Sequence, residues 1–345
     1  MSVTRACSRG WLLLVAALVA STARGAERRP APTGRLVDLG GHRLHIRCTG
    51  LGHPTVVVEN GLGDFSFDWA LVERRVSEFA RICTYDRGGY AWSDPGPKPR
   101  TFDQLNLELH DALAKLGEKA PYVLVGHSFG GPVVRQYTLS YPGEVVGMVL
   151  VDSVHEDQRV PIAGKAVRLR DGAKGLWIPE PRETMRPEDR PQAADPPPPL
   201  QPRRQLADLD PLYRGLPLAL QKLRLWAETL AATDDAEASQ REWSTEYFAK
   251  WHETDQEGSL GSLPLLVLSR EKGGYSDKLD VPAATLDAER LAGQTALARL
   301  SRHGKRRTLS SGHQMHLEVP DEVAGAIKQV VEEARHRRAT RQSAS

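Results

Sequence analysis

Short apolar runs alternate with amphipathic stretches along much of the chain. Continuous apolar runs at Thr55–Glu59, Tyr122–Val125 and Val145–Val151 predict strands that are buried on both faces of a sheet. Between the first two, leucines recur every three or four residues in Phe102–Leu116, which predicts an amphipathic helix that ends at Gly117. This alternation is typical of an α/β protein with a mainly parallel sheet and helices on both faces.

The same patterns predict the remaining elements of the sheet and its helices. We expect the strands Leu36–Leu39 and Leu44–Cys48 to pair antiparallel around a turn at Gly40-Gly41. The further strands are Leu36–Leu39, Leu44–Cys48, Arg81–Tyr85, Leu263–Leu268 and Arg307–Leu309, and the further helices are Trp69–Phe79, Leu286–Leu300 and Asp321 to about Arg335.

The chain changes character between residues 156 and 262, which predicts an insertion between two strands of the sheet. A Pro- and Arg-rich segment covers 179–204, and two helix-like segments follow at Leu216–Ala232 and Ala236–Trp251. We interpret the proline-rich segment as a stiff surface spacer; recruitment of a partner through a polyproline helix is the alternative.

The first 25 residues have the composition of an export signal. Arg5 and Arg9 precede the apolar run Trp11–Ala20, and small residues follow. This pattern predicts a signal peptide that is cleaved near Ala23–Ala26, and export to the periplasm or the cell exterior. The run is short for a bilayer, so we expect no stable membrane span after its removal; an uncleaved anchor is the alternative.

Charge argues against a nucleic-acid partner once the signal is set aside. The whole chain has 46 Lys+Arg and 44 Asp+Glu, a formal charge of +2, but residues 1–25 hold three of the basic residues and no acidic one. The rest therefore carries about −1, and no basic cluster of the kind that binds phosphate backbones stands out.

Gly126-His127-Ser128-Phe129-Gly130-Gly131 is the strongest chemical signal. It follows a predicted strand and precedes a helix-compatible segment, which is the context of a G-x-S-x-G nucleophile turn. Glycines are needed where the backbone turns this sharply. The motif predicts Ser128 as a nucleophile; an ordinary glycine-rich turn is the alternative.

A second turn, Glu59–Asp64, follows the strand Thr55–Glu59. A turn there can aim a backbone N–H at a reacting carbonyl, so we predict that Leu62 and Phe129 supply the two N–H groups of an oxyanion hole. Asn60 either orients this turn or is a simple turn former.

His313 lies in a loop between the last predicted strand and the last helix. It directly follows Gly312, and we predict that it is the general base of Ser128; His316 is the competing candidate. The two histidines have no further ligands at a zinc-site spacing, so we predict no metal. His127 is expected to pack or to form hydrogen bonds rather than to react.

Together these segments and Tyr85–Asp94 resemble the α/β-hydrolase superfamily over about Leu36–Ala334, in its serine esterase and lipase-like branch. The resemblance implies an eight-stranded, mostly parallel sheet, a helical cap and no cofactor. Asp86 and Arg87 would be structural. The implied organisation is a signal peptide at 1–25, a hydrolase core at 34–155 and 263–336, a cap at 156–262 and a disordered tail at 337–345.

The acid of a Ser-His-Asp triad departs from the commoner pattern of this superfamily. Many relatives carry an aspartate shortly after strand seven, but here that strand leads into Ser269-Arg270-Glu271. A minority place the acid after strand six, which selects Asp152; Asp277 and Glu271 remain alternatives. Asp152 could instead cap the following turn.

Cys48 and Cys83 are the two cysteines outside the signal. In the superfamily the strands that carry them are neighbours, so the resemblance implies a disulfide in an oxidising compartment. Two separate buried thiols are the alternative.

The combined pattern predicts a serine hydrolase that cleaves a carboxylic ester of a small acyl substrate through an acyl-enzyme. Amides, lactones and carbon–carbon bonds remain open, as does a catalytically silent binding protein on the same scaffold. The sequence predicts no oligomeric state. Aromatic residues of the insertion line the acyl pocket or form the core of the cap: Trp226, Trp243, Tyr247, Phe248 and Trp251.

Overall fold

The computed structural model describes residues 29–343, except 187, 189–203, 255, 272 and 277. The predicted signal peptide, most of the proline-rich segment and Asp277 therefore lie outside the described residues. The helices and strands belong to the unit Pro32–Ser345. Within the described part of the chain, no helix combines the length and apolarity needed to cross a bilayer.

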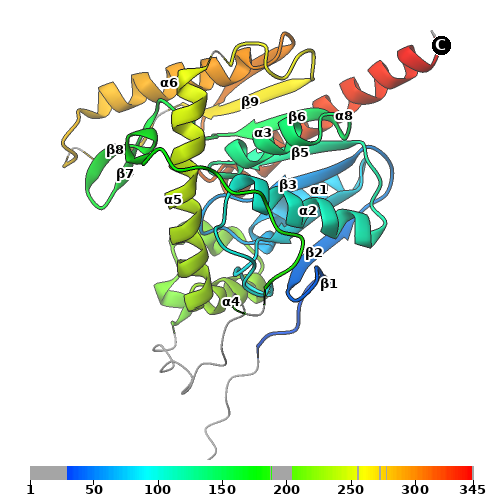
Figure 1. Cartoon of the computed structure of the whole chain (residues 1–345), viewed down its shortest axis with the longest axis horizontal. Coiled ribbons are helices and arrows are strands. Elements are labelled where there is room, and N and C mark those ends of the chain that lie inside the picture. Colours follow the sequence, from blue (N-terminus) through cyan, green and yellow to red (C-terminus); the bar gives the residue numbers. More distant parts are fainter. Residues whose placement is uncertain are drawn as a thin grey trace, which may run out of the picture. The chain divides into compact units, whose positions relative to one another are not determined.

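An eight-stranded sheet organises the chain, with strand order β1-β2-β4-β3-β5-β6-β9-β10. β1 pairs antiparallel with β2, and β2 pairs antiparallel with β4; the other neighbours are parallel. The predicted fold class is confirmed (Figure 1). The strands are β1 Arg35–Asp38, β2 Arg43–Thr49, β3 Thr55–Glu59, β4 Ile82–Asp86, β5 Tyr122–His127, β6 Val145–Val151, β9 Leu265–Arg270 and β10 Gly304–Leu309.

Helices cover both faces of the sheet and bury two apolar layers. α2 (Phe102–Leu116), α3 (Gly130–Ser140) and α6 (Ala283–Arg299) pack on one face. α1 (Ala70–Val76) and α8 (Pro320–Ser343) pack on the other. Because β3, β5 and β6 are covered on both sides, their sequences are continuously apolar rather than alternating.

The helix predicted at Phe102–Leu116 forms with these bounds. The Thr101 side chain accepts a hydrogen bond from the backbone N–H of Gln104 and caps its start, and Gly117 adopts a φ of 78° at its end. The end of the chain differs from the prediction: α8 continues to Ser343, so the expected disorder of 337–345 is wrong for the part that is described.

Between β6 and β9 the chain forms a separate group of elements. Two helices lie close to the predicted bounds, but the hairpin of β7 and β8 was not predicted. The group consists of β7 Arg159–Ile162, β8 Lys165–Arg168, η2 Leu169–Gly172, η4 Leu206–Asp208, η5 Pro211–Gly215, α4 Leu218–Ala227 and α5 Ala231–Glu253.

The hairpin turn explains why the pattern missed it. Ala163 and Gly164 both have positive φ, 48° and 78°, as a two-residue hairpin turn of this kind requires. Alanine rarely adopts this conformation, so the sequence carries no typical turn signal there. Pro161 within β7 also argues against a strand in a sequence-based prediction.

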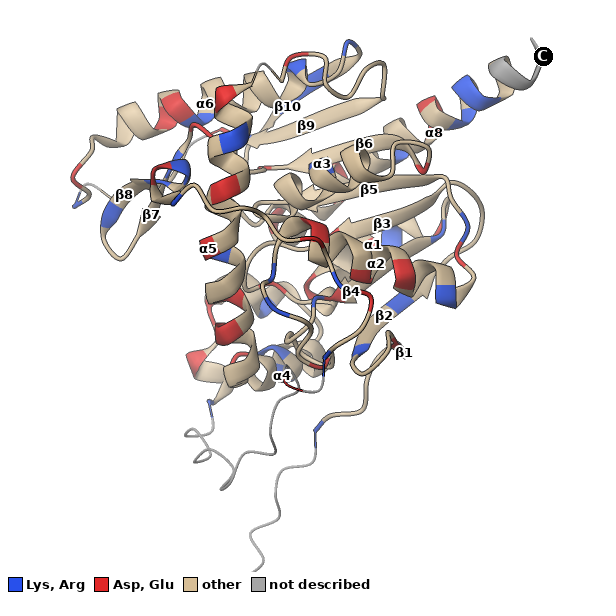
Figure 2. Ribbon diagram, viewed as in Figure 1, with Lys and Arg blue, Asp and Glu red and all other residues tan. Residues whose placement is uncertain are grey.

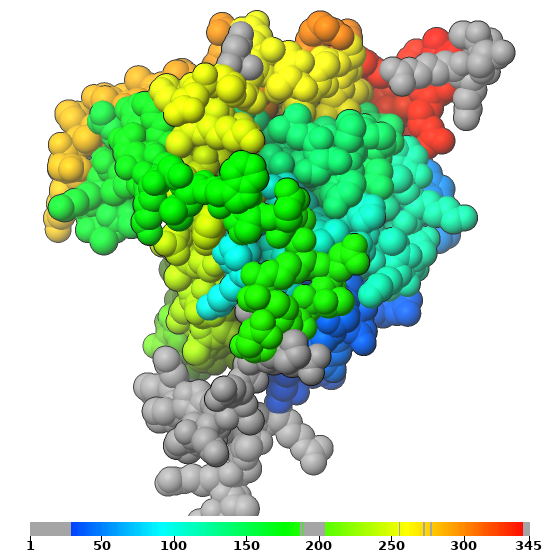
Figure 3. Space-filling model, in the orientation of Figure 1, coloured from blue at the N-terminus to red at the C-terminus, as the bar shows by residue number. Residues whose placement is uncertain are grey.

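An extended segment after this hairpin, 173–186, lies against α2. The side chain of Gln104, on α2, exchanges two hydrogen bonds with the backbone of Arg182, at 2.8 and 3.1 Å. Figure 3 shows this part of the chain in green, lying across the face in view beside α2 and α3. Tyr247 of α5 also donates a hydrogen bond to the Asp103 carboxylate on α2, at 2.6 Å.

Charged residues are spread over the helices. Figure 2 shows Lys and Arg interspersed with Asp and Glu along the ribbon. Several form pairs on the surface, such as Arg43 with Asp94 and Lys98 with Asp235. Exposed pairs of this kind contribute little to stability.

A disulfide joins β2 to β4. Cys48 and Cys83 are direct partners in the antiparallel register of these strands, and their sulfur atoms are bonded. The bond closes a loop of 35 residues.

We expect the double variant Cys48→Ala/Cys83→Ala to lose about 3–4 kcal/mol of unfolding free energy, because a cross-link over such a loop restricts the unfolded chain. Denaturant unfolding of the variant and of the wild type, each with and without reductant, measures this loss. The reduced wild type should match the variant. Two free thiols in the unreduced folded protein would contradict the expectation.

Candidate active site

Ser128 lies in a strained turn where β5 passes into α3. Its φ is 52°, which lies in a region that residues other than glycine rarely adopt. Three backbone hydrogen bonds hold the turn: the Ser128 N–H donates to Val151, and the Ser128 carbonyl accepts from Gly131 and Val154, all at 3.0–3.1 Å.

The three glycines of the turn are required by space. A Cβ on Gly130 would lie 2.3 Å from the Glu59 carbonyl oxygen, and a Cβ on Gly131 would lie 1.8 Å from Ser153 Oγ. A Cβ on Gly126 would lie 2.7 Å from the Gly130 carbonyl oxygen. The strand, the turn and the helix are therefore in contact at the level of the backbone, which fixes the direction of Ser128.

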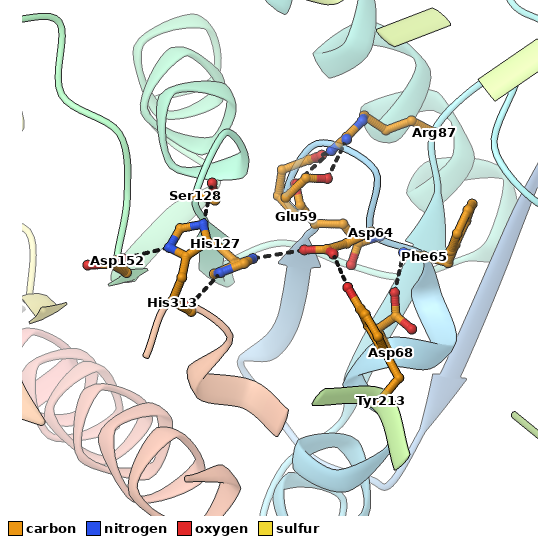
Figure 4. Close-up of polar contacts among 12 residues, drawn as sticks. Glu59, Asp64, Phe65, Asp68, Arg87, His127, Ser128, Asp152, Tyr213 and His313 are labelled. Carbon is orange, nitrogen blue, oxygen red and sulfur yellow. Dashed lines mark hydrogen bonds and ion pairs between the residues drawn. The ribbon is translucent and has the colours of Figure 1, made fainter. Parts of the chain in front are cut away.

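His313 bridges Ser128 and Asp152 (Figure 4). Its Nε2 lies 3.0 Å from Ser128 Oγ, and its Nδ1 lies 2.6 Å from Asp152 Oδ2. His313 comes from the loop between β10 and the short helix α7 (Met315–Glu318), and Asp152 directly follows β6. The structure thus brings together three residues that the sequence analysis singled out.

The partners of His313 set its tautomer. An ionised carboxylate can only accept, so Nδ1 carries the proton that points at Asp152. Nε2 is then the unprotonated nitrogen and can accept the hydroxyl proton of Ser128. This is the arrangement that a general base needs before reaction.

Opposing effects set the pKa values of this pair. Burial would raise the pKa of Asp152, but the hydrogen bond from His313 and the charge of Arg270 outweigh it and hold that pKa below its ordinary value. The pKa of His313 is also lowered, by partial burial first and by neighbouring His127 and Arg270, against the opposing effect of Asp152. Asp152 is therefore ionised and His313 neutral at neutral pH.

Glu271, the other described candidate for the acid, does not make this contact. Glu271 is exposed just past the end of β9, and Asp277 lies outside the described residues. Arg270, the last residue of β9, instead donates through Nη1 to Asp152 Oδ2 at 2.7 Å. Nothing in the local sequence around Arg270 indicates which carboxylate it pairs with, so this contact could not be predicted.

The predicted oxyanion turn packs against the start of α3. The space around Gly130 is filled by the carbonyl groups of Glu59 and Asn60, so this turn lies beside the turn that holds Ser128 and Phe129. Arg87, on the loop after β4, donates to the carbonyl of Gly61 at 2.6 Å. In a trans peptide the next N–H points the opposite way, so the N–H of Leu62 points away from Arg87.

A buried ion pair anchors that turn. Arg87 also donates to Glu59 and to the carbonyl of Asn60, both at 2.7 Å. Tyr85 donates a short hydrogen bond to Glu59, and the Asn60 side chain donates to the Tyr85 carbonyl. Arg87 is thus a structural residue, and Asn60 orients the turn.

The two other histidines near the site have different surroundings. His127 lies 3.0 Å from Asp64 through Nδ1 and 3.0 Å from the His313 carbonyl through Nε2, so it holds the His313 loop by hydrogen bonds. His316 is fully buried and stacks on Trp69, with ring centroids 4.6 Å apart. Its burial lowers its pKa well below the ordinary value, so the ring is neutral.

Aromatic residues of α5 lie next to Phe129, the neighbour of Ser128. Tyr247, Phe248 and Trp251 form one apolar cluster with Phe102 and Phe129. Of the other aromatic candidates, Trp226 packs on Trp92 in a different cluster, and Trp243 is partly exposed.

The chain belongs to the alpha/beta hydrolase family, whose model matches residues 56–326. A hydrolase of 2-hydroxy-6-oxononadienedioate and 2-hydroxy-6-oxononatrienedioate from Paraburkholderia phymatum is 32% identical over 137 residues, which are 38% of this chain and 47% of the relative. A probable transporter from Hormonema carpetanum is 36% identical over 129 residues, 35% of this chain and 18% of the relative. The chain thus matches less than half the length of either protein.

Solved structures share the fold over most of their length. A meta-cleavage product hydrolase from Pseudomonas fluorescens IP01 superposes with a TM-score of 0.58 at 18% identity, covering 87% of this chain and 97% of that one. An esterase from Thermogutta terrifontis gives 0.56 at 21% identity, with 85% and 94% coverage. An enol-lactonase from Burkholderia xenovorans LB400 gives 0.56 at 21% identity, with 86% and 100% coverage.

The packing around the serine turn leads to a prediction for Gly131→Ala. The added methyl group collides with Ser153, so we expect a loss of about 1–3 kcal/mol in unfolding free energy. Gly325→Ala is the matched control, because Gly325 is an exposed position of α8 with nothing within 4 Å of the new Cβ. The control should be neutral or gain up to about 1 kcal/mol. Equal stabilities of the two variants in urea unfolding would contradict the expectation.

Proposed function

We propose that the protein is a serine hydrolase that cleaves a carboxylic ester through an acyl-enzyme. Ser128 is the nucleophile, His313 the general base and Asp152 the acid that orients it. The observation that carries this proposal is the continuous hydrogen-bonded chain from Ser128 Oγ through the His313 ring to Asp152 Oδ2.

The first half-reaction forms the acyl-enzyme. His313 Nε2 takes the Ser128 proton while Oγ bonds to the ester carbon, and the N–H groups of Leu62 and Phe129 bind the resulting oxyanion. His313 then gives the proton to the leaving oxygen, the ester C–O bond breaks, and the alcohol departs. The acyl group remains on Ser128.

The second half-reaction releases the acid. His313 takes a proton from a water molecule as the water oxygen bonds to the acyl carbon. His313 then gives that proton to Ser128 Oγ as the bond between Oγ and the acyl carbon breaks. Ionised Asp152 stabilises the imidazolium that forms in each half. The lowered pKa of His313 keeps the base neutral, and therefore active, to a pH below 6.5, the ordinary value for histidine.

The aromatic residues of α5 form packed core beside the serine turn. Tyr247, Phe248 and Trp251 are at most 5% exposed and pack with Phe102 and Phe129. The leading substrates are therefore carboxylic esters as a class, on the chemistry of the triad alone. Hydrolysis of an oxo acid at a carbon–carbon bond is a second candidate, which the name of the Paraburkholderia phymatum relative favours. The two differ in whether nitrophenyl esters or oxo dienoic acids are turned over.

The proposal includes action outside the cytosol. Its support is the export-like composition of residues 1–25 together with the bonded pair Cys48 and Cys83, because disulfides persist in oxidising compartments.

We expect Ser128→Ala to lower kcat/KM for p-nitrophenyl esters by at least about a thousandfold. Ser140→Ala makes the same change at an exposed position of α3 and should retain wild-type activity. Steady-state kinetics with acyl chains of two to eight carbons measures both variants and the chain-length preference. A wild type that hydrolyses neither these esters nor an oxo dienoic acid would favour a silent binding protein instead.

A further inference from the structure

We propose that Arg270 is a positioning residue of the triad: from the end of β9 it holds the Asp152 carboxylate against His313 and places a permanent positive charge beside the base. This inference rests on the proposed function, because it assigns a role within the same reaction. Arg270 does not touch Ser128 or the reacting atoms in the proposed mechanism.

Arg270 contacts the same Asp152 oxygen that accepts the hydrogen bond from His313. Arg270 Nη1 donates to Asp152 Oδ2 at 2.7 Å, and His313 Nδ1 donates to the same oxygen at 2.6 Å. The backbone N–H of Arg270 approaches the other oxygen, Oδ1, at 3.4 Å. The carboxylate is therefore held from the β9 side with one oxygen aimed at the imidazole.

The arginine is itself held in place. Arg290 of α6 donates to the Arg270 carbonyl at 2.9 Å, and the Arg270 guanidinium lies 5.6 Å from the ring centre of Tyr275. The N–H of Asp152 donates to Leu268 of β9 at 2.8 Å, so the acid and the arginine are joined through the backbone as well.

Burial strengthens the electrostatic effect of the Arg270–Asp152 pair on neighbouring groups. The side chain of Arg270 is 10% exposed and that of Asp152 is 3% exposed, so little solvent screens the charges. Breaking such a pair from one side would leave Asp152 without its fixed counter-charge. A solvent-exposed arginine could not act on His313 in the same way.

Three groups, each from a different element, act on the charge of the His313 imidazole. Asp152 after β6 favours the imidazolium, while Arg270 of β9 and His127 of β5 oppose it. His316 of α7, on the far side of His127, is neutral because it is buried. Removal of the Arg270 charge therefore raises the pKa of His313, and the base becomes protonated at a higher pH.

Three substitutions separate charge from hydrogen bonding. Arg270→Lys keeps the charge, Arg270→Gln keeps an uncharged donor on a shorter side chain, and Arg270→Met removes both the charge and the donor. We expect the acidic limb of kcat/KM for p-nitrophenyl acetate to remain within about 0.3 pH units of wild type in R270K, and to rise by about one unit in R270Q and R270M. At a pH well below the limb, the last two should therefore be about tenfold less active relative to their own plateau.

Nuclear magnetic resonance of the His313 ring provides a second readout that needs no catalysis. In a Ser128→Ala background, the titration of His313 should shift upward with R270Q and not with R270K. A purely structural ion pair would lower the stability of the variants without moving the limb or the titration. Should R270M fail to fold, R270Q and R270K carry the comparison.

The role of Arg270 would be overturned if R270Q changed neither the His313 titration nor the acidic limb of kcat/KM. It would also be overturned if R270K raised both as much as R270Q does. This outcome is distinct from failure of the proposed function. If the wild type hydrolyses no ester, the function is wrong, while the His313 titration still tests Arg270. If esters are hydrolysed and depend on Ser128, only the assignment of Arg270 is at risk.

Discussion

The left-handed backbone of Ser128 is the constraint from which the site follows. A residue with a side chain sits at a φ of 52° because β5 must turn at once into α3, and three backbone hydrogen bonds hold it there. The neighbouring glycines let the helix start, the Asn60 turn and Ser153 approach to contact distance. These close contacts hold the strained turn in place, and Ser128 Oγ consequently points toward His313.

The order of the strands assembles the rest. β5, β6, β9 and β10 are neighbours in the sheet, and each contributes one group at or just past its carboxyl end: Ser128, Asp152, Arg270 and His313. Parallel strands bring these ends to one edge, where an open α/β sheet offers a crevice. The Asp152 carboxylate then accepts hydrogen bonds from both the Arg270 guanidinium and the His313 ring.

Residues with local signals could be predicted from the sequence. Buried strands such as Val145–Val151 are recognisable because both faces are covered, and the serine turn because its glycines have no substitute. Asp152 was selected as one candidate among three, and its contact with His313 spans 161 positions. Arg270 carries no local signal at all, since its partner lies 118 positions away. The hairpin of β7 and β8 could not be predicted, because Ala163 in its turn adopts a positive φ that alanine rarely takes.

Covalent labelling shows whether Ser128 is an activated nucleophile. A fluorophosphonate reacts with an activated serine and loses fluoride, so intact-mass measurement followed by peptide mapping locates the nucleophile. We predict one adduct per chain, on Ser128, and no adduct in His313→Ala, in which no base takes the proton. A wild-type protein that takes up no label, or that takes it up at another residue, would contradict the assignment of Ser128 as an activated nucleophile.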